Sequence, residues 1–252
     1  MLIYGNSDLK TSLARISARC VDSLWPPCCA YCKNPVDQQH MLCATCWERM
    51  PTLSGDSCRF CGTPVVGDYE PLCQSCYEIP RPWTYGHAAA QYDGLARDMI
   101  LSLKNGGKES YAPILAKLIY QRNPRAFSGL DALTAMPLHW RRLLSRGYNQ
   151  AGLLCGNLCK IAHIPFEPRL ITRKRHTQKQ GKHADFEKRF LNLSNALSVP
   201  SHSYSKVQDK RIGIIDDVMT SGASLHYATE ALLHAGAEEV RVFVFARAGN
   251  SD

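Results

Sequence analysis

Apolar residues in the larger, C-terminal part of the chain follow two alternating patterns. RIGII at 211–215 is apolar at nearly every position, as strands buried on both faces are. SLHYATEALLHAG at 224–236 instead places its apolar residues along one side of a helix. Because such segments alternate, we expect an α/β fold with a largely parallel sheet flanked by helices. The expected strands are 85–92, 130–138, 211–217 and 239–248, and the expected helices are 94–103, 112–120, one from about 148, and 224–236.

Two segments interrupt this alternation. IPRPW at 79–83 contains Pro80 and Pro82, which oppose helix formation and mark a boundary between two parts of the chain. Residues 165–210 are too long for an ordinary connection between elements, so we expect a functional loop or a small hood there.

No stretch of the chain approaches 18 uninterrupted apolar residues, so we expect no membrane span. The first twenty residues lack the apolar centre of a signal peptide and instead resemble a short amphipathic helix, with Leu9, Leu13 and Ile16 along one side. We therefore expect a cytoplasmic protein.

The cysteines are concentrated before the Pro-rich boundary. Eight of the twelve form four C-x-x-C pairs, and the segment is duplicated: CAYCKNPV precedes CATC, and CRFCGTPV precedes CQSC. A cytosolic chain keeps thiols reduced, and two thiolate pairs make a tetrahedral zinc site. We expect two structural zinc ribbons, because four thiolates leave no open position for catalysis. The expected ligands are Cys29, Cys32, Cys43, Cys46, Cys58, Cys61, Cys73 and Cys76.

The four C-x-x-C pairs, or knuckles, can be shared between two zinc ions in two ways. Sequential pairing, with Cys29 to Cys46 on one ion and Cys58 to Cys76 on the other, is the simpler one. A cross-braced arrangement, in which knuckles from the two repeats share an ion, is the alternative.

The strand at 211–217 ends in two acids and a string of small residues. Asp216 and Asp217 come directly after the apolar run, at a strand end of the kind where open α/β sheets bind ligands. The following residues open a helix, whose N–H groups attract an anion. Together, these features predict a ribose 5-phosphate site; the alternative is an ordinary capped helix. The loop residues are Thr220, Ser221, Gly222, Ala223 and Ser224.

This stretch is similar to the phosphoribosyl pyrophosphate (PRPP) loop of type I phosphoribosyltransferases. From Cys29 to the C-terminus the chain resembles one branch of them, the ComF/GntX family. The resemblance rests on the cysteine knuckles and on four further motifs. These are LKNGGK at 103–108, MPLHWRRLLSRGYNQ at 136–150, RKRHTQKQ at 173–180 with Arg189 and Asn192, and the loop at 213–224.

The resemblance implies a role for each motif residue. Asp216 and Asp217 would contact ribose, and Thr220 to Ser224 would hold its 5-phosphate. The loop from Met136 would bind pyrophosphate, with Mg²⁺ accompanying PRPP. The pyrophosphate residues would be Pro137, Leu138, Arg141, Arg142 and Arg146.

The same resemblance implies three parts. They are an N-terminal helical segment at 1–27, a double zinc ribbon at 28–82, and a phosphoribosyltransferase-like domain at 83–252. The resemblance does not imply a particular reaction. We assign no catalytic residue, because we identify no segment (the hood of phosphoribosyltransferases) that would recognise a base.

Charge adds a possible nucleic-acid partner. The net charge is +8, yet residues 1–80 hold more acids than bases, so the excess lies on the larger part. A dense basic run is typical of a solvated face or of a strip that follows a phosphate backbone. Trp140, Tyr148 and Phe186 could pack in the core or stack on bases. The candidate nucleic-acid residues are Arg173, Lys174, Arg175, Lys179, Lys182 and Arg189.

Members of the resembled family are linked to natural transformation. We therefore expect a competence protein that handles incoming single-stranded DNA on the cytoplasmic side and carries a PRPP-type pocket. Its zinc ribbons would contact the DNA-uptake machinery. The alternatives are an active phosphoribosyltransferase acting on an unknown base or amine, and a PRPP-sensing adaptor.

Overall fold

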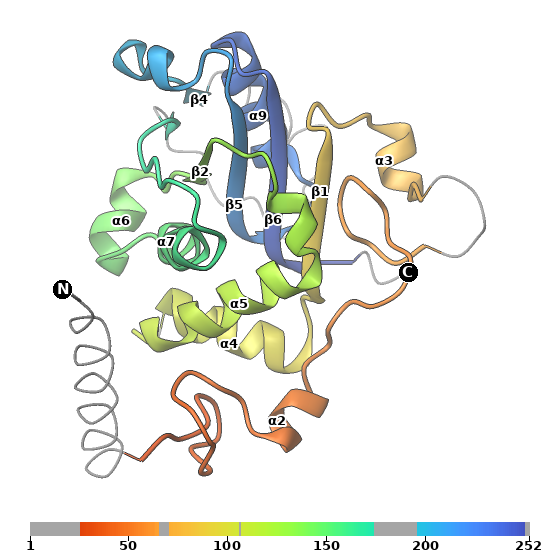
Figure 1. Cartoon of the computed structure of the whole chain (residues 1–252), viewed down its shortest axis with the longest axis vertical. Coiled ribbons are helices and arrows are strands. Elements are labelled where there is room, and N and C mark those ends of the chain that lie inside the picture. Colours follow the sequence, from red (N-terminus) through yellow and green to blue (C-terminus); the bar gives the residue numbers. More distant parts are fainter. Residues whose placement is uncertain (1–25, 66–70, 106, 174–195, 250–252) are drawn as a thin grey trace, which may run out of the picture. The chain divides into compact units, whose positions relative to one another are not determined.

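Four parallel strands form the central sheet in the order β1–β6–β5–β2 (Figure 1). The strands belong to a computed structural model that describes residues 26–65, 71–105, 107–173 and 196–249. The sheet confirms the α/β fold expected from the alternating pattern. The strand bounds are β1 Tyr85–Gln91, β2 Ala132–Ala135, β5 Arg211–Met219 and β6 Glu239–Arg247.

The sheet is covered by helices whose apolar faces were visible in the sequence. Helices α5 and α7 pack against each other, α7 also contacts β2 and β5, and α9 contacts β6. Helix α6 was not expected, since none of its seven residues is fully buried and no apolar period marks it. The helix bounds are α4 Gly94–Asn105, α5 Ala112–Arg122, α6 Trp140–Arg146, α7 Gln150–Ala162 and α9 Ala223–His234, with 3-10 turns at Glu109–Tyr111, Pro124–Phe127 and Ser201–Lys206.

The long connection between α7 and β5 contains a short antiparallel pair. Strands β3 (Thr172–Arg173) and β4 (Leu197–Ser198) hydrogen-bond to each other, with Arg173 opposite Leu197. Residues 174–195 lie outside the described part of the chain. The two ends of that stretch are therefore held side by side.

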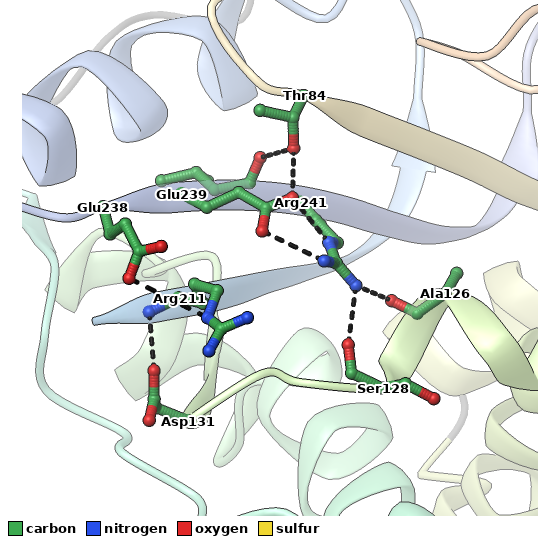
Figure 2. A network of polar contacts seen from close by, with 9 residues as sticks. Thr84, Ala126, Ser128, Asp131, Arg211, Glu238, Glu239 and Arg241 are labelled. Carbon is green, nitrogen blue, oxygen red and sulfur yellow. Dashed lines mark hydrogen bonds and ion pairs between the residues drawn. The ribbon is translucent and has the colours of Figure 1, made fainter. Parts of the chain in front are cut away.

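A polar network fixes the edge of the sheet where β5 and β6 begin (Figure 2). Arg241 Nε donates to Glu239 Oε1 over 2.7 Å, and Thr84 Oγ1 donates to the same oxygen over 2.6 Å. Arg241 Nη1 also donates to the carbonyls of Ala126 and Ser128 at 2.8 and 2.9 Å. The guanidinium of Arg241 holds the pKa of Glu239 below its usual value. These contacts stabilise the amino-terminal edge, and the opposite edge remains for the site.

The chain divides into two compact units, Met1–Glu48 and Arg49–Asp252. The first contains one cysteine cluster, an antiparallel bridge between Cys28 and Pro35, and helix α2 (Ala44–Glu48). The second repeats this local fold, with a bridge between Ser57 and Pro64 and helix α3 (Gln74–Glu78). The duplication seen in the sequence is thus also a structural one.

The second ribbon is packed directly on strand β1. Trp83 Nε1 donates to the carbonyl of Phe60 over 2.7 Å, and Gly86 N donates to the carbonyl of Arg59 over 2.8 Å. A Cβ on Gly86 would lie 2.4 Å from the Phe60 oxygen, so glycine is required there. The sequence boundaries at 27/28 and 82/83 remain predictions about sequence modules. As packed units, the two ribbons fall on different sides of the division after Glu48.

Within the described part of the chain, we found no helix that is both long and apolar enough to cross a membrane.

Candidate functional site

The candidate site lies where β2 and β5 end. The two strands are parallel, with Ala135 opposite Ile215, and Met136 N donates to the carbonyl of Ile215 over 2.9 Å. The residue after each partner is therefore Met136 on one strand and Asp216 on the other. This places the predicted pyrophosphate loop beside the predicted ribose-binding acids.

The two acids interact with each other and with a lysine. The backbone N–H of Asp217 donates to Asp216 Oδ1 over 2.8 Å. Lys104 Nζ, from the last turn of α4, lies 2.9 Å from Asp217 Oδ2. Lys104 belongs to the LKNGGK motif, to which no role was assigned from sequence; its spacing in α4 gave no sign of this contact.

The environment makes ionisation of Asp216 costly. Burial, followed by the nearby charge of Asp217, raises the pKa of Asp216 to about 7, although Lys104 and Arg173 act in the opposite direction. A cation or hydrogen-bond donor that approaches the acidic pair therefore stabilises it. Ribose hydroxyls are donors of this kind.

A cavity of about 340 Å³ gathers seven of the twelve predicted ribose-phosphate and pyrophosphate residues, but its lining does not include Thr220, Ser221, Gly222 and Ala223 of the predicted phosphate loop. Its acidic side carries Asp216 and Asp217, and its basic side carries cations from three elements. Such a mixed lining suits a ligand that has both hydroxyl and phosphate groups. The predicted members found in the lining are Pro137, Leu138, Arg142, Arg146, Asp216, Asp217 and Ser224, and Arg173, predicted as a nucleic-acid residue, lines the cavity as well.

Arg141 lies elsewhere in the site region. Its guanidinium carbon lies 5.3 Å from the ring centroid of Trp140, a cation–π arrangement, while Arg142 and Arg146 line the cavity. Successive residues of the short helix α6 point in different directions, which explains the difference. The roles of all these residues remain predictions.

The motif RGYNQ connects the pieces of the cavity wall. Tyr148 Oη donates to the carbonyl of Leu103 at 2.5 Å, and Asn149 Nδ2 donates to the carbonyl of Met136 at 3.0 Å. Arg146 Nη1 donates to Gln150 Oε1 at 3.0 Å. Among the described residues, the buried atoms Asn149 Oδ1 and Gln150 Nε2 have no hydrogen-bond partner, although both residues line the cavity.

The predicted phosphate loop connects β5 to α9. Gly222, the N-cap residue, has φ of 78°, a left-handed conformation that favours glycine. Ala223 N donates to Ser221 Oγ over 3.4 Å. Arg247 Nη1 donates to the carbonyl of Met219 over 3.1 Å and also to that of Thr220. The strand that follows α9 thus supports the start of the loop.

An apolar groove of about 580 Å³ adjoins the mixed cavity. The two share Pro137, Leu138, Asn149 and Arg173. The groove also contains Trp140, which is 57% exposed, together with Leu143, Phe166 and Arg169. Apolar and aromatic side chains next to arginines are suited to a stacked planar ring.

Two clusters of four cysteines form the candidate metal centres. Each cluster has its sulfur atoms within 4.8 Å of one another, and the pairing is sequential. The Sγ atoms of Cys61 and Cys73 lie 3.5 Å apart, as do those of Cys32 and Cys43. Tetrahedral zinc with bonds of about 2.3 Å would separate its sulfurs by about 3.8 Å. The donor set and the spacing fit structural zinc at both centres.

The described part of the basic run reaches the cavity through Arg173. Burial is the main cause of the lowered pKa of Arg173, and the charge of Arg142 contributes. The other candidate nucleic-acid residues, together with Phe186, lie outside the described residues. They are Lys174, Arg175, Lys179, Lys182 and Arg189.

Two domain families match this chain. Residues 20–77 match the "Double zinc ribbon domain", and residues 156–252 match the "Phosphoribosyl transferase domain". The first match spans the division between the two compact units, whereas the second covers the loop at 216–224 and strands β5 and β6.

Curated relatives match over most of their length. "DNA utilization protein YhgH" of Escherichia coli (strain K12) is 30% identical over 229 residues, which cover 88% of this chain and 97% of that protein. "Competence protein F" of Haemophilus influenzae is 27% identical, covering 87% of this chain and 96% of the relative. "Competence protein ComFC" of Bacillus subtilis is 24% identical, covering 77% and 79%. The chain therefore belongs to the ComF family, and it combines a double zinc ribbon with a phosphoribosyltransferase domain.

Proposed function

We propose that this protein handles incoming single-stranded DNA during natural transformation, on the cytoplasmic side, and that its PRPP-type pocket binds a ribose phosphate. The single observation that carries the proposal is the shared wall of two sites. A cavity with acids and arginines borders an apolar groove that contains the exposed Trp140. The relatives named for competence and DNA utilization support the same reading.

The cavity and the groove together match the alternating chemistry of a nucleic-acid strand. Arg142 and Arg173 would meet phosphates. Asp216 and Asp217 would accept hydrogen bonds from the ribose hydroxyls of PRPP, because sugars within a DNA strand carry no free hydroxyl. In the groove, Trp140 would stack on a base, an interaction worth about 1–3 kcal/mol per base and nearly independent of sequence. The basic run that starts at Arg173 would follow the backbone beyond the groove.

Binding of labelled oligonucleotides across a salt series tests the proposal. Wild-type protein should bind single-stranded oligothymidylate more tightly than double-stranded DNA, and its affinity should fall steeply as the salt concentration rises. Trp140→Ala should weaken binding by about 1–3 kcal/mol, and an abasic strand should show no such loss. Trp47→Ala is the matched control, since Trp47 is 48% exposed and belongs to the first unit. Absence of single-strand binding at low salt would refute the proposal.

The same titration with PRPP and Mg²⁺ locates the strand. Mg²⁺ would neutralise the pyrophosphate, a role that hard cations have with phosphate oxygens. Competition by PRPP would place DNA in or beside the acidic cavity. Independent binding of the two would separate the groove from the pocket.

Phosphoribosyl transfer is the second candidate, and the arginines that line the cavity beside the acidic pair favour it. In that reaction an acceptor nitrogen bonds to C1 of the ribose as pyrophosphate leaves. Arg142 and Arg146 would stabilise the departing negative charge, and the acidic pair would hold the ribose hydroxyls. Asp216→Asn combined with Asp217→Asn should abolish pyrophosphate release but leave salt-dependent DNA binding nearly intact. A PRPP-sensing adaptor would show PRPP binding without release.

The first zinc ribbon is the surface that we assign to the DNA-uptake machinery. It forms a compact unit of its own, within Met1–Glu48, and carries the exposed Trp47. Exposed tryptophans are enriched among residues that dominate protein interfaces.

A further inference from the structure

We propose that the second zinc centre holds the phosphate loop in its binding conformation through Arg81, so that loading of this centre controls affinity for a ribose phosphate. The affinity part of this inference rests on the proposed pocket. The positioning part rests on contacts within the larger unit alone. Arg81 acts as a positioning residue and is not assigned contact with the ligand.

Arg81 joins a predicted zinc ligand to the loop. Its Nε donates to Cys76 Sγ at 3.5 Å, and its Nη1 donates to the carbonyl of Ser221 at 3.1 Å. Cys76 belongs to the second cluster, and Ser221 is one of the predicted 5-phosphate residues. The side chain of Arg81 therefore contacts two residues, Cys76 and Ser221, that are 145 positions apart in the sequence.

The guanidinium is held firmly in this position. Arg81 is 8% exposed and lies 5.6 Å from the ring centroid of Trp83, itself 1% exposed. Trp83 is fixed in turn by its hydrogen bond to the carbonyl of Phe60, in the second ribbon. A planar guanidinium with donors in fixed directions can bridge two acceptors in this way, whereas an ammonium cannot match that geometry.

Charge explains why the link depends on zinc. Four thiolates around one Zn²⁺ leave a net charge of about −2, which stabilises a buried cation nearby. Without the metal, a ribbon this small would lose most of its folding free energy, and Cys76 would no longer be held opposite Arg81. The arginine would then turn toward solvent and release the Ser221 carbonyl.

The loop is packed closely enough to respond. A Cβ on Gly222 would lie 3.2 Å from Arg81 Nη1 and 3.5 Å from the Trp83 ring, so the backbone lies directly on these side chains. Arg247 supports the carbonyls of Met219 and Thr220, and Arg81 supports the next one. The direction of the following N–H groups, which would face the phosphate, is set by these carbonyl contacts.

The test compares two arginine substitutions beside the same ribbon. Arg81→Met removes the bridge but keeps a long apolar side chain. Arg59→Met is the control, because exposed Arg59 lies 5.2 Å from the ring of Phe60 in the same ribbon. Three quantities are measured: zinc per chain by mass spectrometry, hydrogen exchange of the peptide covering 218–224, and the Kd for ribose 5-phosphate by calorimetry.

Arg81→Met should retain two zinc ions, exchange the loop amides about tenfold faster and weaken ribose 5-phosphate binding by at least about tenfold. Arg59→Met should match the wild type in all three. If Arg81→Met loses zinc, Arg81→Lys serves instead, since it keeps the charge but cannot span both acceptors. Unchanged loop exchange in the variant that keeps its zinc overturns the inference.

Removing each centre separately provides the second arm. Cys73→Ser should lose one zinc and reproduce the faster loop exchange, whereas Cys43→Ser, in the first unit, should lose one zinc and leave the loop unchanged. Equal rates of hydrogen exchange of the loop amides in the two variants would contradict the inference. If wild-type protein does not bind ribose 5-phosphate but its loop still responds to Arg81→Met, the pocket proposal fails and the positioning role stands.

Discussion

Lys104 Nζ lies 2.9 Å from Asp217 Oδ2, and this ion pair joins helix α4 to the acidic pair. Burial and the charge of Asp217 raise the pKa of Asp216, and the positive charge of Lys104 opposes this rise. Lys104 also lines the mixed cavity of about 340 Å³ and a second cavity of about 420 Å³, which shares Arg142 and Arg146 with it. This lysine therefore stabilises the acids and also attracts an anionic ligand.

Replacing this lysine should affect both properties. Lys104→Met should raise the pKa of Asp216 further, because a nearby positive charge that favours the carboxylate is removed. Binding of ribose 5-phosphate should weaken about tenfold, as expected for the loss of a charge-assisted contact of about 1.5 kcal/mol. Carboxyl NMR titration and calorimetry measure the two effects. Lys117→Met, at an exposed position of α5, is the control, and an equal effect there would argue against a local role.

The pH dependence of stability follows from Asp216. Its pKa in the folded protein, about 7, lies above the ordinary value of 3.8 for an aspartate, so the folded state binds an extra proton between these two pH values. The contribution of this group is therefore favourable at low pH and is lost as pH rises from about 4 to 7. The charged groups that act on it are Asp217, Lys104 and Arg173.

Asp216→Asn should accordingly stabilise the free protein at pH 8, by about 1–3 kcal/mol, and should do so much less at pH 5. Urea unfolding at the two pH values gives the comparison. The exposed Asp209 provides the control, since Asp209→Asn changes the same charge away from the site. A stabilisation of equal size at both pH values would contradict the assigned cause.

The sheet and its helices could be predicted because their apolar periods report burial directly. The acids and loop at 216–224 were recognisable for a similar reason, since charges after a buried strand and hydroxyls before a helix have few structural explanations. Helix α6 lacked an apolar period. The contacts of Lys104 and Arg81 depend on how distant segments fold together, and no local pattern encodes such pairs.

The division after Glu48 was hidden for a related reason. The two ribbons have similar motifs, and only packing distinguishes them. The glycines that permit this packing, Gly62 and Gly86, look like ordinary turn or strand glycines in the sequence. Their close approach to β1 and to Phe60 becomes visible only in the folded chain.

Gly86→Ala should damage the contact between the second ribbon and β1. The added Cβ would lie 2.4 Å from the Phe60 oxygen and 3.0 Å from Trp83 Nε1, at a buried position near the start of β1. We expect a loss of about 2–4 kcal/mol, the upper range for overpacking, measured by thermal or urea unfolding. Gly156→Ala is the control: its nearest contact would be Phe166 at 4.0 Å, and the change should stabilise α7 by up to about 1 kcal/mol.

Loss of the first zinc centre should leave the sheet unit intact. Cys29 and Cys46 belong to the cluster in Met1–Glu48, whereas the sheet and the second cluster belong to Arg49–Asp252. Because zinc binding is the main source of folding free energy in a ribbon this small, Cys29→Ser with Cys46→Ser should unfold that ribbon alone. The variant should hold one zinc per chain and show an unchanged main unfolding transition by calorimetry. A lower temperature of the main unfolding transition would mean that the stability of the sheet unit depends on the first ribbon. The two units could not then be treated as separate.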